Sequence, residues 1–166
     1  MSVRRVVAVD ANVLINLIHV DALDLLGKLD DFDFVVMEDV IQEIARPAQA
    51  AALVNAISQA WIRRERLEQP EGLTLFAELG RVVDRGEAAT LAWAAVASAS
   101  IACDDRRARR EADHRLGKGK ILTTPGLLIL AIRAGLLTVA GADQMKKVLE
   151  ANHFKMAFAS FGDVLS

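Results

Sequence analysis

Short apolar runs alternate with helical patterns along the chain, and this alternation predicts a parallel sheet built from βαβ units. Four runs are expected to be buried strands and a fifth is weaker: 6–9, 34–37, 100–103, 120–123 and, with less apolar character, 61–64. Apolar residues recur at helical spacing in the segments between and after them: 13–18, 23–29, 40–44, 50–60, 87–94, 105–116, 125–134 and 143–151. Pro47 is expected to close the helix at 40–44. The pattern therefore predicts an α/β fold.

The composition narrows the class of protein. With 166 residues the chain is expected to form one domain, 1–166, in which 152–166 is a C-terminal extension that adds an edge strand, caps the core or contacts a partner. The 53% of hydrophobic residues excludes a disordered tail. The net charge of −2 excludes a broadly basic nucleic-acid binder but allows a local basic patch. Cys103, the only cysteine, excludes an internal disulfide and a Cys-rich zinc module. No segment has the length of a signal-peptide core or a membrane span, so we expect a cytoplasmic protein with no membrane partner.

Acidic residues stand at the ends of predicted strands and beside apolar helical stripes. Asp10 directly follows the first strand, and Asp104, with Asp105 beside it, follows the strand at 100–103. The carboxyl ends of parallel strands line the ligand crevice of such a sheet, so these acids are expected to converge. Glu43 lies next to a buried stripe, and Glu87 begins an almost wholly apolar helix. Several buried carboxylates need a cation, and hard oxygen ligands suit Mg²⁺ or Mn²⁺.

Each acid also has a structural interpretation. Asp10 is a possible N-cap for the helix after it, and Glu43 a possible solvated helix acid. Glu87 suits the first turn of a helix, and at least one of Asp104 and Asp105 is expected to cap the next helix. The combination of positions is what favours a site over four unrelated acids.

That combination resembles the PIN-domain family, especially its VapC-like toxin branch, over residues 3–140. The matching segments are VVAVDANVLINL around Asp10, VIQEIARP around Glu43, DRGEAATLAWA around Glu87 and IACDDRRARREADHRLG around Asp104. The segment ILTTPGLLILAIRAGLL then looks like the strand, turn and helix that follow the last acid in these proteins. The resemblance implies a three-layer α/β/α sandwich with a central parallel sheet.

The resemblance also implies a metal-dependent endonuclease, usually acting on RNA. Asp10, Glu43, Glu87 and Asp104 match the catalytic acids of the family. The metal ligands implied are Asp10, Glu87 and Asp104, with Asp105 as a neighbour whose role the sequence does not decide. The cofactor implied is Mg²⁺ or Mn²⁺, which activates water and neutralises charge on the phosphate.

The substrate side is less specific. Asn12 matches a small polar position near the first acid. Thr123 and Thr124 lie where relatives often have a Gly-Thr pair, although Thr-Thr-Pro stands here, and Thr123 is the candidate for substrate binding. The basic run 106–120 either holds phosphates, with Arg107 and Arg110 as first candidates, or is a solvated helix face. The lack of tyrosine and the 5% of aromatic residues argue against a base-stacking platform.

The expected partners are an RNA substrate, an antitoxin protein and a second copy of the chain in a homodimer. The apolar helices at 12–18 and 50–60 exceed what one small core needs, which favours a covering partner. A processing nuclease that is not a toxin and a non-catalytic RNA-binding or scaffold protein remain open alternatives. A phosphotransfer protein fits less well, because a haloacid-dehalogenase-like phosphatase needs an aspartate where Asn12 stands.

Overall fold

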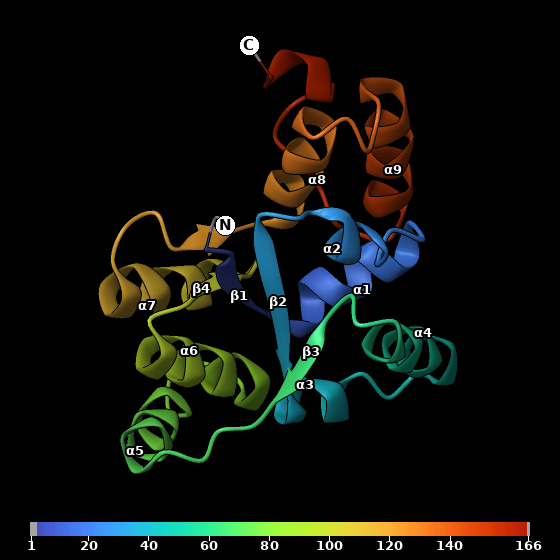
Figure 1. The fold of residues 1–166 in the computed structure, drawn as a ribbon. Coiled ribbons are helices and arrows are strands. Elements are labelled where there is room, and N and C mark those ends of the chain that lie inside the picture. The colour runs from blue at the N-terminus through green and yellow to red at the C-terminus, as the bar shows by residue number, and fades with distance from the viewer. Residues whose placement is uncertain (1–2, 166) are drawn as a thin grey trace.

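A five-stranded sheet crosses the middle of the molecule in this computed structural model, which describes residues 3–165 (Figure 1). The order of the strands is β3-β2-β1-β4-β5, and every neighbouring pair is parallel. The described residues form these elements: β1 (Arg5–Val9), α1 (Ala11–His19), α2 (Leu25–Lys28), β2 (Phe32–Met37), α3 (Glu38–Glu43), α4 (Pro47–Ser58), β3 (Arg63–Glu65), α5 (Pro70–Leu79), α6 (Arg85–Ala97), β4 (Ser100–Ala102), α7 (Arg106–Leu116), β5 (Ile121–Leu122), α8 (Thr124–Arg133), α9 (Val139–Ala151) and the 3-10 helix η1 (Phe161–Asp163). The predicted parallel sheet is confirmed.

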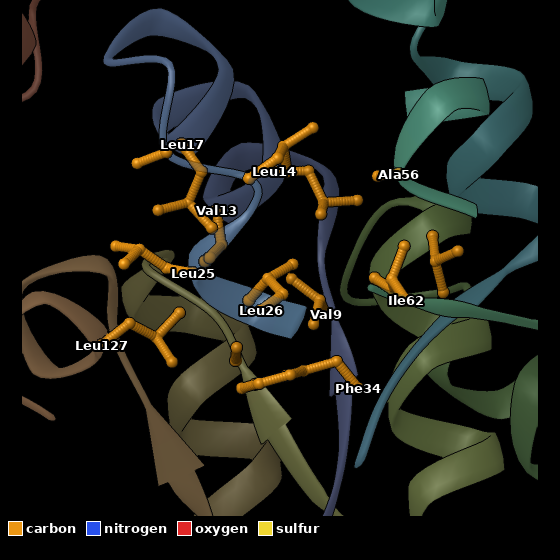
Figure 2. Close-up of a cluster of buried hydrophobic side chains, with 14 of the residues drawn as sticks. Val9, Val13, Leu14, Leu17, Leu25, Leu26, Phe34, Ala56, Ile62 and Leu127 are labelled. Atoms are coloured by element: carbon orange, nitrogen blue, oxygen red, sulfur yellow. The ribbon is translucent and has the colours of Figure 1, made fainter. Parts of the chain in front are cut away.

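Helices cover both faces of the sheet because successive strand residues point to opposite sides. Val7 and Val9 belong to a core that also contains buried residues of α1, α2, α4, α8 and α9, and Figure 2 shows part of it around Phe34. Ala8 and Ile101 face the other way and pack with buried residues of α6 and α7. Burying one large core side chain, such as that of Ile101, stabilises the fold by about 1.5–3 kcal/mol. The arrangement is the expected three-layer α/β/α sandwich.

The direction of the chain across the sheet reverses between β1 and β4. The chain runs outward from β1 through β2 to β3, and then returns to place β4 and β5 on the other side of β1. Ligands of open α/β sheets bind at such a switch point, at the carboxyl ends of the strands. Asp10 and Asp104 follow the two strands that meet there.

Parts of the helical pattern differ from the sequence-based expectation. Helix α3 ends at Glu43, and Pro47 is the first residue of α4 rather than the end of the preceding helix, because proline's fixed φ suits the first helical position. Helix α5 was not expected, although Pro70 at its first turn is the same signal. Helix α9 begins at Val139, earlier than expected, because the Thr138 hydroxyl accepts a hydrogen bond from the Gly141 N–H and caps it.

The tail after α9 folds back onto that helix. Asp143 of α9 accepts hydrogen bonds from the Ser160 hydroxyl at 2.7 Å and the Phe161 N–H at 2.8 Å, and these bonds lower its pKa. The Phe161 side chain is fully buried. From residue 152 to 165 the chain adds no strand to the sheet, so it covers part of the core instead. Within residues 3–165, no helix is both long enough and apolar enough to cross a membrane.

Candidate functional site

Asp10 lies at the end of β1 with its carboxylate withdrawn from solvent. The Asp10 N–H donates a hydrogen bond to the carbonyl of Ala102 at 2.9 Å, which fixes Asp10 beside the end of β4. Asp10 occupies the N-cap position of α1, yet its side chain makes no capping hydrogen bond. The side chain is contacted instead by the thiol of Cys103, whose Sγ lies 3.8 Å from Oδ2. Asp10 is only 2% exposed, and because its side chain makes no capping hydrogen bond, a helix-capping role does not account for its burial.

Asp104 is held by residues of two other elements. The Thr124 N–H and hydroxyl, at the start of α8, donate to its two carboxylate oxygens at 2.8 and 2.5 Å. The Asn16 side-chain amide, from α1, donates to Asp104 at 3.1 Å and to the Thr124 hydroxyl at 3.3 Å. Burial raises the pKa of Asp104, while these hydrogen bonds and the charge of Arg109 oppose the shift. The carboxylate therefore has one fixed orientation.

Glu43, the last residue of α3, reaches across to the first turn of α6. The Gly86 N–H donates to its Oε1 at 2.7 Å. A Cβ added to Gly86 would lie only 2.5 and 2.6 Å from the two carboxylate oxygens of Glu43. Glycine at this position therefore allows the approach of the carboxylate to the helix terminus.

Glu87 and Asp84 form a reciprocal cap at the start of α6. The Asp84 carboxylate accepts from the Glu87 N–H at 2.9 Å, and the Glu87 carboxylate accepts from the Asp84 N–H at 3.2 Å. This capping box satisfies two N–H groups that the helix leaves unpaired. Glu87 is nevertheless buried, with 8% of its surface exposed. The first-turn interpretation of Glu87 is thus correct but incomplete.

Burial and neighbouring carboxylates raise the pKa of Asp10 and Glu87 at this end of the sheet. Burial raises the pKa of Asp10 to about 7, and the charges of Glu87, Asp84 and Glu43 add to the shift. Burial raises the pKa of Glu87 to about 7 as well, and Asp84, Asp105 and Glu43 add to it. Glu43 is exposed, yet partial burial of its carboxylate also raises its pKa. The fold therefore brings Asp10, Glu43 and Glu87 into one negative field.

The other predicted residues have different surroundings. Asp105 caps α7, accepting from the Ala108 N–H at 2.9 Å, as expected for one member of the Asp104–Asp105 pair. Asn12 is exposed on α1, and Thr123 caps α8 by accepting from the Gly126 N–H at 3.1 Å. Arg107 and Arg110 line a cavity that Glu87 and Asp105 also line.

Sequence reasoning missed Asn16 and Asp84, and of the threonine pair at 123 and 124 it favoured Thr123. Asn16 was hidden within an apolar helical stripe, where a buried polar residue is itself a signal because it needs a partner. Thr124, and not Thr123, is the threonine that bonds Asp104. Asp84 and Glu87 have the D-x-x-E spacing of a capping box, which would have placed Asp84 at the site.

The donor chemistry fits a divalent cation. Within residues 3–165, no three His, Cys, Asp or Glu side chains form a group that could hold a metal ion. Mg²⁺, however, commonly keeps several waters and is bound through only one or two carboxylates. Asp10 and Glu87 are both buried, and the charge of one raises the pKa of the other, so a bound cation would offset the cost of ionising them together.

Comparison with known proteins agrees with this geometry. A family model described as PIN domain matches residues 6–160, nearly the whole chain. No curated protein gives a match. PIN domains are generally nucleases that act on nucleic acid and typically use divalent metal ions. With the parallel three-layer fold and the acids at its switch point, this match shows that the chain belongs to the PIN-domain family.

Proposed function

We propose that this protein is a Mg²⁺- or Mn²⁺-dependent endoribonuclease formed by a single domain over 1–166. The observation that supports it most is the shared field of Asp10, Glu43 and Glu87, in which the pKa of both Asp10 and Glu87 is raised to about 7. Carboxylates that ionise only at such cost are suited to bind a cation rather than to remain bare.

The residues of the chain have separable roles in this proposal. Asp10 and Glu87 would hold the cation directly, and Asp104, with Asp105 at the edge of the site, would contact it through its bound waters. When bound, the cation supplies an activated water and neutralises charge on the phosphate. Glu43, at the end of α3, would orient that water or accept a proton from it.

Three neighbouring contacts keep these acids in position. Asn16 and Thr124 fix the orientation of Asp104, and the Gly86 N–H fixes Glu43. On the substrate side, Asn12 and Thr123 would approach the scissile nucleotide from the ends of two helices. These proposals require that phosphodiester cleavage depend on carboxylates at four separate positions in the chain.

A toxin role with an antitoxin partner is the finer level of the proposal. A cavity of about 450 Å³ lies among α1, α2 and α4, and its lining includes Ile18, Leu23 and Trp61. Val54 on α4 is 59% exposed. The apolar side chains of this partly polar cavity, together with exposed Val54, support a covering partner, either an antitoxin segment or a second copy in a homodimer, acting in the cytoplasm. The alternative is a processing nuclease that has no antitoxin.

The test compares Asp10→Asn with Asp30→Asn. Asp30 is an exposed aspartate outside the acidic field, so its variant controls for the loss of one charge. We expect the wild type and D30N to cleave single-stranded RNA with Mg²⁺ or Mn²⁺ and not with EDTA, and D10N to lose cleavage while keeping the circular-dichroism spectrum. Cleavage by D10N at the wild-type rate would refute the assignment. RNA binding without any metal-dependent cleavage would favour the non-catalytic alternative. Growth arrest on expression of the wild type, absent with D10N, would distinguish a toxin from a processing enzyme.

A further inference from the structure

A cavity of about 600 Å³ lies beside the acids, between the loop that joins α5 to α6 and the first turns of α7. One wall comes from residues 81–84 with Glu87, and the other from Asp105, Arg106, Arg107 and Arg110. Arg81 is thus on the opposite wall from the arginines of α7. A weak hydrogen bond from Arg107 to the carbonyl of Val82, at 3.4 Å, joins the two walls.

Within the part of the chain that the structure describes, the arginines of this cavity have no carboxylate partner. Among residues 3–165, Arg81, Arg106, Arg107 and Arg110 form no salt bridge within 4.0 Å. Farther along the same helix, by contrast, Arg115 approaches two glutamates.

The acids that line the cavity are engaged elsewhere. The Asp84 carboxylate caps α6 and the Asp105 carboxylate caps α7, so each already accepts a hydrogen bond from a backbone N–H. Each guanidinium carries five N–H donors, in a planar arrangement that matches the oxygens of phosphate. The cavity therefore combines unused donors of the right geometry with an adjoining acidic site.

We propose that this cavity holds a second phosphate of the nucleic-acid backbone, one that is not cut, and that Arg81 is a binding residue for it together with Arg110. The proposal rests on the proposed function, because it takes the acids as the place where the scissile phosphate lies. Glu87 and Asp105 border both the acidic site and the cavity, so the second phosphate belongs to a nucleotide adjacent to the scissile one. The enzyme should accordingly favour substrates with at least two phosphodiester linkages.

Binding tests this independently of cleavage. In the Asp10→Asn background with Mg²⁺, fluorescence anisotropy would measure the Kd of labelled oligouridylates containing one to four linkages. We expect affinity to rise between one linkage and several, and the combined Arg81→Gln and Arg110→Gln changes to remove that rise, weakening the longer oligonucleotides at least about tenfold. The slope of log K against log salt should fall by about 0.7, as for one lost phosphate contact on a single strand.

Arg133→Gln is the matched control, because Arg133 is exposed on α8 and also forms no salt bridge among the described residues. This variant should keep the wild-type length dependence and salt slope. If the combined Arg81 and Arg110 variant behaves like R133Q, the second phosphate site is refuted. Both positions are exposed, so thermal melting should show that the variants remain folded.

Cleavage separates this proposal from the proposed function. With Asp10 restored, we expect the ratio of kcat/KM for a four-linkage oligonucleotide to that for bis(p-nitrophenyl) phosphate to fall at least about tenfold in the combined variant. An unchanged ratio would show that the arginines serve the scissile phosphate alone, which overturns the inference and leaves the nuclease assignment intact. If the wild type cleaves neither substrate, the proposed function fails, and the anisotropy data still decide whether the cavity binds phosphate.

Discussion

Replacing Gly86 with alanine would separate the position of Glu43 from the stability of the fold. The new Cβ would lie 2.5 and 2.6 Å from the carboxylate oxygens of Glu43, which is closer than van der Waals contact allows. The atoms in the way belong to the end of a flexible side chain, so Glu43 should swing away and lose its hydrogen bond from the Gly86 N–H. The acid would remain in the protein but outside its observed position.

Two opposing effects on stability should nearly cancel. Loss of the hydrogen bond costs about 1 kcal/mol, because Glu43 is exposed and water replaces the Gly86 N–H as its partner. Alanine in the first turn of α6 returns about 0.5–1 kcal/mol through its higher helix propensity. The free energy of unfolding should therefore change by less than about 1 kcal/mol, and Tm by no more than about 4 °C.

Activity should fall by about 10–100-fold, the usual effect of losing a group that orients a site ligand. RNA cleavage and urea unfolding would be measured for G86A, for Glu43→Gln, and for Gly141→Ala as the matched control. Gly141 also lies in the first turn of a helix and donates its N–H to a side-chain oxygen, that of Thr138, but on α9. G141A should keep wild-type cleavage. Full activity in G86A would show that the position of Glu43 is irrelevant, and a loss of more than about 3 kcal/mol in stability would show that Glu43 is not free to move.

Three further results are expected. The raised pKa of Asp10 and Glu87 means that the folded protein binds more protons there than the unfolded chain between pH 4 and 7. The wild type therefore loses stability as the pH rises through that range, because the folded state must give up these protons. Urea unfolding should accordingly show that Asp10→Asn gains stability relative to the wild type from pH 4 to 7. Mg²⁺ or Mn²⁺ should raise Tm more at pH 8 than at pH 5, and much less in D10N; an equal rise in D10N would place the metal elsewhere. Thr124→Val should reduce cleavage more than Thr123→Val, since only Thr124 holds Asp104; equal activities would contradict that distinction. Urea unfolding should show a loss of about 1.5–3 kcal/mol for Thr124→Val and about 1 kcal/mol for Thr123→Val.

The sequence was sufficient for the sheet because buried parallel strands are short apolar runs that stand out between helical segments. Asp10 and Asp104 could be placed at one edge of the sheet because each follows such a run directly. Helix α5 was harder to predict: Leu75, Phe76 and Leu79 recur at helical spacing, but the exposed Leu73 lies off that stripe and obscures the pattern.

The contacts around the acids could not be derived from periodicity. Asn16 and Thr124 are 108 positions apart, and only the packing of α1 against α8 brings their side chains together. The choice between Asp104 and Asp105 as a helix cap depends on backbone direction at the end of β4, which adjacent identical residues do not reveal. Asn12 and Asn16 pose the same difficulty, because one helical turn separates an exposed amide from a buried one.

The start of α7 places a strict limit on chain length. Asp104 turns toward Asn16 and Thr124, and Asp105 caps the helix. Arg106, Arg107 and Arg110 then line the cavity, with no spacer between Asp105 and Arg106. Inserting or deleting one residue here would rotate the arginines by about 100° around the helix while Asp104 stayed fixed to the sheet. Activity should therefore tolerate the substitution of one arginine in this segment better than the insertion or deletion of one residue.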